Sequence, residues 1–174
     1  MSLTITYLHV FVKNANSPSG VLRVGQSEYP CLIGKKGKTF RKREGDHRSP
    51  IGKWKLERLY FRPDKKLHPQ AQLSCQPLQR HDGWCDAKGH GLYNRHVTLP
   101  FSASYENLWR EDDAYDLVVS TNQNQIPRIQ GGGSAIFLHV INKGTSGTEG
   151  CVALSEHHLR LVLSRCSRHT YLVI

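Results

Sequence analysis

Hydrophobic and polar positions in the first third of the chain alternate with a period near two, which predicts β-strands. Leu3–Val12 alternates threonine with apolar residues, Gly20–Val24 and Tyr29–Ile33 are short apolar runs, and Trp54–Tyr60 keeps the same period. β-Branched and aromatic residues on this period are typical of strands that bury one face. These segments predict a β-meander at the start of a β-rich protein.

The second half of the chain predicts further buried strands and one helix. Tyr115–Val119, Ala135–Ile141 and His169–Ile174 read as strands. Ser155 suits the N-cap of the helix, because its hydroxyl accepts a hydrogen bond from a free amide of the first turn. The apolar stripe of this helix follows the spacing i, i+3, i+4 and i+7 and consists of Leu159, Val162, Leu163 and Cys166.

The length and the middle of the chain define the predicted domain organisation. The 174 residues suit a single domain, 1–174. Residues 63–107 are irregular, rich in His, Gln, Asp and Gly, and long for a structureless loop, which indicates an inserted lid. The predicted fold class is mainly β, with one clear C-terminal helix and this long irregular lid segment.

Charge narrows the choice of partners. The 24 Lys and Arg exceed the 14 Asp and Glu by ten, which favours an anionic partner such as nucleic acid, anionic lipid or a carboxylate-rich polymer. Many of these cations lie in residues 34–48, here called the basic loop, which has one aromatic residue, Phe40, and no nucleic-acid-binding motif. We therefore expect a solvated loop, and a basic non-catalytic protein that binds nucleic acid or cell wall remains the alternative. The sequence shows no span of about 20 apolar residues and no export signal at Met1–Lys13.

The segment Phe137–Leu154 carries the strongest chemical signal. An apolar strand delivers His139, and a polar, glycine-rich loop then ends at Cys151. A histidine can remove the proton of a nearby thiol, so these residues can form a thiolate–imidazolium pair. The alternative is a core histidine with a buried structural cysteine. The hydrophilic loop between them favours the catalytic interpretation, because catalytic groups are often presented on loops by rigid strands.

This segment resembles the L,D-transpeptidase catalytic domain (YkuD) family, whose hallmark is a strand histidine, a loop and a Ser/Thr-x-Gly-Cys turn. His139 and Thr148–Cys151 match that order. The resemblance implies an L,D-transpeptidase-like β-sandwich over most of the chain. Other segments that resemble the family or one bacterial branch of it are Gly45–Gly52, Gly133–His139, Asp82–Asp86 and Tyr93–Arg95.

The family's catalytic roles transfer to matching positions. The resemblance implies Cys151 as the nucleophile and His139 as the general base, oriented by a backbone carbonyl such as that of Val140. The amides of Gly150 and Cys151, with the backbone of Glu149, would form the oxyanion hole. The chain departs from the more familiar branch at Glu149, where that branch has His, and at Val140, where it has Gly or Ser. The His-to-Cys loop is shorter, and Val152–Leu154 contains no Arg or Asn.

The resemblance also implies a reaction and a substrate. Cys151 would attack a stem peptide of peptidoglycan, or a muropeptide, and form a thioacyl-enzyme. An amine acceptor gives transpeptidation, and water gives an L,D-carboxypeptidase or endopeptidase. The family implies a cell-envelope or periplasmic location, possible acylation by carbapenems, and no cofactor. A cytoplasmic location stays open because no export signal is visible.

The middle segment offers two further hypotheses. As a lid, it would present Trp84 and Tyr93 as apolar walls and Arg95 as a carboxylate clamp, with Asn94 and Thr148 as additional substrate-binding residues. The alternative is an ordinary surface loop. The segment also holds Cys75, His81, Cys85, His90 and His96 without Cys-x-x-Cys spacing, so no metal site is expected, while a Cys75–Cys85 disulfide stays open.

Overall fold

The main sheet of the computed structural model, which describes residues 4–174, has nine strands whose spatial order differs strongly from their order in the chain. In spatial order the strands are β11 (Leu117–Thr121), β12 (Phe137–Val140), β13 (Val152–Leu154), β3 (Ser27–Leu32), β2 (Ser19–Val24), β1 (Tyr7–Val12), β14 (Tyr171–Val173), β6 (Lys53–Phe61) and β7 (Ser74–Pro77). An additional antiparallel pairing of β11 with β6 joins the two sides. Every strand of this sheet except β7 therefore has hydrogen-bonded neighbours on both sides. The two layers expected of a sandwich are joined into one continuous sheet by the β11–β6 pairing.

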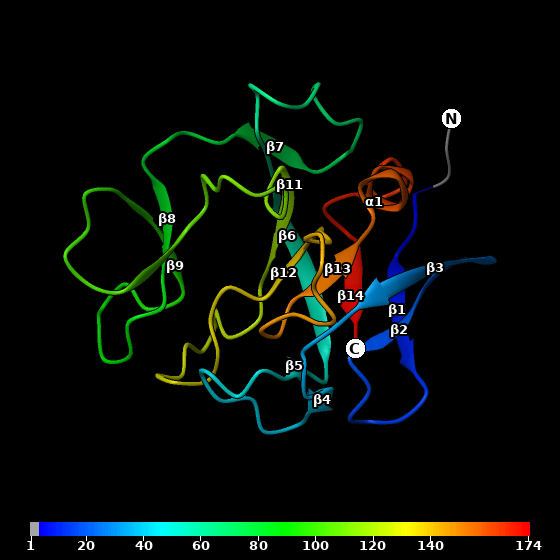
Figure 1. Ribbon diagram of the computed structural model, residues 1–174, viewed down its shortest axis with the longest axis horizontal. Coiled ribbons are helices and arrows are strands. Elements are labelled where there is room, and N and C mark those ends of the chain that lie inside the picture. Colours follow the sequence, from blue (N-terminus) through cyan, green and yellow to red (C-terminus); the bar gives the residue numbers. More distant parts are fainter. Residues whose placement is uncertain (1–3) are drawn as a thin grey trace.

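Two smaller sheets complete the β-structure. One contains β10 (Tyr105–Asn107), β8 (Asp82–Cys85) and β9 (Arg95–Thr98), and β8 and β9 lie apart from the main sheet in Figure 1. The other pairs β4 (Lys38–Thr39) with β5 (Ser49–Pro50), at the two ends of the basic loop.

The structure confirms a mainly β fold with one helix and corrects the irregular segment. The first predicted strand starts at Leu3, which lies outside the described residues, and β1 begins at Tyr7. Residues 63–107, predicted to be irregular, contain β7, β8, β9 and β10. These strands have three or four residues each, too few for a visible period of two, and all four residues of Asp82–Cys85 are buried.

The helix α1 (Glu156–Leu163) begins where its capping residue predicts. Ser155 Oγ accepts a hydrogen bond from the His158 amide at 3.2 Å. Leu159 and Val162 from the predicted stripe are fully buried in the core of the main sheet. In residues 4–174, no helix has the length and apolar character required to cross a bilayer.

Alternation along the strands creates two separate apolar clusters. Leu138 of β12 and Leu117 of β11 point into the main core, which also holds the helix stripe. Their neighbours Phe137 and Val118 point to the opposite face, because successive side chains of a strand alternate. There they pack with Trp84 of the three-stranded sheet. The second cluster thus fixes the small sheet over the outer face of β11 and β12, where the candidate site lies.

Candidate active site

The parallel pairing of β12 and β13 brings Cys151 and His139 to one face. Leu138 lies opposite Val152 in this pairing, and His139 lies opposite Ala153. Cys151 directly precedes β13 and lies two positions before Ala153, the partner of His139, so its side chain is on the same face as that of His139. Both side chains line one cavity of about 590 Å³. Residues 12 positions apart in sequence thus meet through strand register.

The Cys151 thiol is held by backbone groups at the floor of this cavity. Sγ lies 3.0 Å from the carbonyl oxygen of Ala135, to which it donates, and accepts from the Phe137 amide at 3.3 Å. The residue is 7% exposed. Burial raises the pKa of the Cys151 thiol to about 12, which the Phe137 hydrogen bond only partly offsets, so the thiol is neutral near pH 7.

The His139 ring is oriented by its own strand. Nδ1 lies 2.7 Å from the carbonyl oxygen of Val140, so the hydrogen bond places the proton on Nδ1 and leaves Nε2 as the basic nitrogen. The Tyr115 ring meets the imidazole edge-to-face at 5.3 Å between centroids. Burial lowers the pKa of His139 to about 4, and the nearby Arg110 charge adds to this effect.

Both reactive groups are therefore uncharged at rest. The sequence suggested that Cys151 and His139 can form a thiolate–imidazolium pair, whereas the directions of both pKa shifts favour a neutral thiol and a neutral imidazole. The physical reason is burial, which penalises the charged form of each group.

The turn that carries the cysteine is fixed by two hydroxyl groups. Thr148 Oγ1 accepts from the Gly150 amide at 3.1 Å and donates to the Cys151 carbonyl at 2.7 Å. Ser49 Oγ, which is completely buried, donates to the Gly150 carbonyl at 2.7 Å and accepts from the Gly34 amide. The Ser-Pro-Ile-Gly element that resembles the family thus supports the catalytic turn from behind.

Gly150 occupies a position that excludes a side chain. Its φ is +144°, and a Cβ atom there would lie 2.9 Å from the carbonyl oxygen of Arg48. The Gly150 amide, one of the two expected oxyanion donors, already donates to Thr148. This arrangement leaves the Cys151 amide as the donor of the turn that can face a developing oxyanion.

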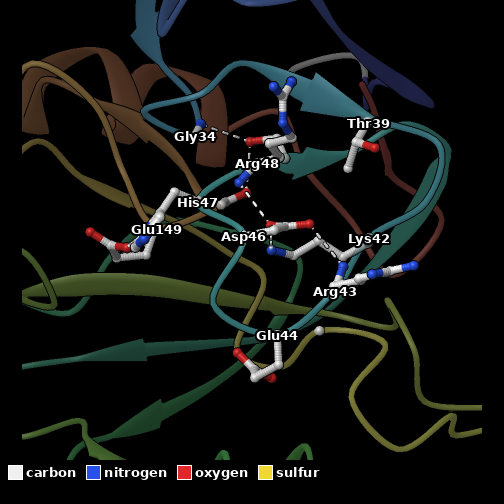
Figure 2. A network of polar contacts seen from close by, with 12 residues as sticks. Gly34, Thr39, Lys42, Arg43, Glu44, Asp46, His47, Arg48 and Glu149 are labelled. Atoms are coloured by element: carbon white, nitrogen blue, oxygen red, sulfur yellow. Dashed lines mark hydrogen bonds and ion pairs between the residues drawn. The ribbon is translucent and has the colours of Figure 1, made fainter.

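Glu149, the main departure from the more familiar motif, pairs its carboxylate with residues of the basic loop. It pairs with Lys35 Nζ at 2.6 Å and with His47 Nδ1, and Figure 2 shows Glu149 beside His47. Partial burial disfavours the carboxylate, but these contacts together lower the pKa of Glu149. The side chain therefore connects the catalytic turn to the basic loop.

Trp84 and Asn94, predicted as substrate-binding residues, lie behind the site rather than on its cavity. Asn94 Oδ1 accepts from Trp84 Nε1 at 2.9 Å and from the Ala135 amide at 3.1 Å. Asn94 and Ala135 both have positive φ, at 56° and 51°. Because the Ala135 carbonyl accepts a hydrogen bond from the Cys151 thiol, this buried contact positions the thiol indirectly.

Tyr93 and Arg95 also lie outside the catalytic cavity. Tyr93 is fully buried, donates to Glu44 Oε2 at 2.5 Å and accepts from the Gly133 amide. Arg95 is exposed and, with Trp84, lines a second cavity of about 520 Å³. Among the predicted substrate-binding residues, Thr148 is the one that lines the cavity of Cys151.

The structure adds a group of cavity residues that the sequence reasoning missed. The Tyr115 hydroxyl donates to Glu106, Arg110 pairs with Asp112 at 2.6 Å, and Asn142 donates to Asp112 at 3.0 Å. Burial raises the pKa values of Glu106 and Tyr115. The sequence signal for this group is the charge-dense stretch Arg110–Asp113, which lies shortly before the buried strand β11.

The cysteine and histidine residues of the middle segment do not converge. Within residues 4–174, no group of three or more His, Cys, Asp or Glu side chains is arranged to hold a metal ion. Cys75 lies on β7 of the main sheet and Cys85 on β8 of the small sheet, and both thiols are free.

Comparison with known proteins identifies the family. No curated protein sequence matches the chain. Among solved structures, Bd1075 of Bdellovibrio bacteriovorus is similar, with 18% sequence identity and a TM-score of 0.44. The match covers 99% of this chain and 53% of that one, so the chain spans about half of the length of Bd1075. The sequence model of the L,D-transpeptidase catalytic domain, YkuD, matches residues 12–174. The chain therefore belongs to the YkuD family of L,D-transpeptidase catalytic domains.

Proposed function

We propose that the protein is a cysteine acyltransferase that acts on peptidoglycan stem peptides through a thioacyl-enzyme on Cys151. The observation that supports this proposal most directly is the placement of Cys151 and His139 on one face of adjacent strands, at one cavity. The thiol is the nucleophile, and the imidazole, with its proton fixed on Nδ1 by Val140, is the base.

Acylation begins from the neutral pair. As Cys151 Sγ bonds to the carbonyl carbon between an L-centre and a D-residue, its proton moves to His139 Nε2. The carbonyl oxygen becomes an oxyanion that the Cys151 amide can stabilise. When the C–N bond breaks, the imidazolium returns the proton to the leaving amine, and the terminal D-amino acid departs. Proton transfer during attack is needed because burial keeps the resting thiol protonated.

Deacylation repeats these steps with an acceptor. An amine of a second stem peptide gives up a proton to His139, attacks the thioester and forms an amide, while the proton returns to Cys151 Sγ. With water as the acceptor, the same site is an L,D-carboxypeptidase or endopeptidase. Carbapenem-type compounds, which acylate nucleophiles, are candidate inhibitors of the same thiol. The family's usual place of action, the cell wall or periplasm, is the proposed location.

The excess of positive charge supports a substrate rich in carboxylates. Mass spectrometry of defined tetrapeptide muropeptides, incubated with the wild type and with Cys151→Ala, tests the proposal. We expect loss of the terminal D-residue, or new dimers, with the wild type alone. Dimers identify an amine acceptor, and free tripeptides identify water. An unchanged substrate in the wild-type sample contradicts the proposed function, and salt-dependent nucleic-acid binding unaffected by Cys151→Ala supports the alternative class.

A further inference from the structure

Lys42 is a buried cation in the wall of the catalytic cavity. It comes from the basic loop, most of whose cations are exposed, yet its side chain is only 7% exposed. It lines the same cavity as Cys151 and His139. A lysine is seldom buried to this degree without a specific partner or role, because removing an ammonium group from water is costly.

Two glycines make the space that Lys42 occupies. A Cβ atom on Gly133 would lie 2.7 Å from Lys42 Cγ and 3.0 Å from Cε, so the aliphatic chain lies over that glycine. A Cβ atom on Gly150 would lie 3.3 Å from Lys42 Nζ. The backbone at both glycines has positive φ. The ammonium group is thereby placed directly beside the residue that precedes the nucleophile.

Asp46 holds the lysine in this position. Its carboxylate pairs with Lys42 Nζ and also accepts from the Arg43 amide at 2.8 Å and the Arg48 amide at 2.9 Å (Figure 2). These contacts lower the pKa of Asp46 against the opposing effect of burial. Three donors share the negative charge of this carboxylate. An ammonium group has three protons, so Lys42 keeps donor capacity for the cavity.

The other charges near Cys151 act in the opposite direction. Glu106, from β10, and Glu149, from the catalytic turn, both disfavour a thiolate, whereas Lys42 favours one. His139 is neutral and Tyr115 is protonated at neutral pH. Lys35 and Arg110 also line this cavity, but Lys35 pairs with Glu149 and Arg110 pairs with Asp112. Lys42 is thus the cavity cation that favours the thiolate against these carboxylates.

We propose that Lys42 is a positioning residue for the acyl-transfer reaction, and that its ammonium group stabilises the negative charge that forms at Cys151 as the thiol gives up its proton. The inference rests on the proposed function. It assigns a catalytic contribution to the basic loop, which from sequence reads as a solvated surface. The effect is electrostatic and acts through the sulfur, so neutralising Lys42 should lower kcat and leave KM nearly unchanged.

The test measures thiol reactivity and turnover in three variants. Alkylation of Cys151 by iodoacetamide is followed from pH 7 to 10, with the peptide that contains Cys151 quantified by mass spectrometry so that the other thiols do not interfere. Lys42→Met keeps the apolar stem and removes the charge. Lys36→Met removes an exposed charge from the same loop and is the matched control. Asp46→Asn keeps Lys42 and removes its counter-charge.

We expect Lys42→Met to slow alkylation of Cys151 about tenfold at a given pH, equivalent to a rise of about one unit in the thiol pKa. Lys36→Met should stay within about twofold of the wild type, because its charge is exposed and screened. Asp46→Asn should accelerate alkylation, since the lysine charge is no longer compensated. If the ion pair were purely structural, Lys42→Met and Asp46→Asn would change the alkylation rate of Cys151 in the same direction. This result would overturn the inference.

The two proposals can fail separately. Alkylation requires no peptidoglycan, so an effect of Lys42 on the thiol is measured even if stem peptides are not processed. Turnover of stem peptides by the wild type, together with alkylation and kcat unchanged in Lys42→Met, overturns the role of Lys42 and leaves the proposed function intact. If Lys42→Met fails to fold, as judged by circular dichroism, the Asp46→Asn variant still tests the inference. Faster alkylation of Cys151 supports the role of Lys42, and slower alkylation overturns it.

Discussion

Two cavities of similar volume, about 590 and 520 Å³, differ sharply in what their walls can do chemically. The first has Cys151 and His139 at the ends of adjacent strands, held by backbone groups of the main sheet. The second has a histidine too, His96, which pairs with Asp82 at 3.0 Å, and an exposed arginine, Arg95. Its histidine faces a carboxylate rather than a thiol.

Size therefore does not distinguish the two cavities, but strand register does. The parallel pairing that aligns Leu138 with Val152 places the Cys151 thiol and the His139 imidazole on one face. Residues of the segment 63–107 contribute to both cavities, and Trp84 links them. The ring of Trp84 lines the second cavity, while its Nε1 holds Asn94 behind the first. Trp84 and Asn94, expected to bind substrate, hold the Ala135 amide behind the thiol.

The largest predicted effect compares the two histidines. His139→Ala should reduce kcat/KM about 10³-fold, because the thiol loses its proton acceptor. His96→Ala, the matched change in the second cavity, should leave kcat/KM within about threefold. Rates of release of the terminal D-residue from a tetrapeptide measure both. Near-normal turnover by His139→Ala would remove it from the role of base.

The pH dependence of kcat/KM should show the effect of burial on His139. The pKa of His139 is about 4, below its ordinary value near 6.5, so the neutral base persists above pH 4. We expect kcat/KM to be flat from about pH 5 to 9 and to fall about tenfold per unit below pH 4. Stopped assays, with circular dichroism to confirm folding in acid, measure the profile. An acid midpoint near 6.5 would show that His139 is not desolvated.

The smallest predicted effect concerns Arg95. Arg95→Ala should change kcat and KM by less than about twofold, because the side chain is exposed and belongs to the second cavity. Steady-state kinetics with a tetrapeptide muropeptide are sufficient. A large rise in KM would instead indicate that Arg95 binds a substrate carboxylate, as the sequence suggested, and that the substrate spans both cavities.

How much of the candidate site could be predicted from the sequence depends on how far apart the interacting residues lie along the chain. Cys151 and His139 are joined by one loop, so a local pattern proposes them. Lys42 reaches the same cavity from a distant loop, and in the sequence it cannot be told from the exposed lysines around it. Glu106 is likewise placed by the pairing of two short strands, β10 and β8, which periodicity does not detect.

The neutral state of Cys151 and His139 also could not be predicted from the sequence. Residue types favoured a thiolate–imidazolium pair, but burial of both side chains decides the charge, and burial depends on the packing of the small sheet over β11 and β12. The helix, by contrast, followed directly from its stripe and from the hydroxyl of Ser155.

Intact-protein mass spectrometry after rapid acid quench is the most direct test of the central claim. The wild type is mixed with a stem tetrapeptide, and the account predicts a mass increase equal to the tetrapeptide minus its terminal D-amino acid, located on Cys151. Cys151→Ala should show no adduct and release no D-residue. Release of the D-residue by Cys151→Ala at the wild-type rate would contradict acyl transfer through this cysteine.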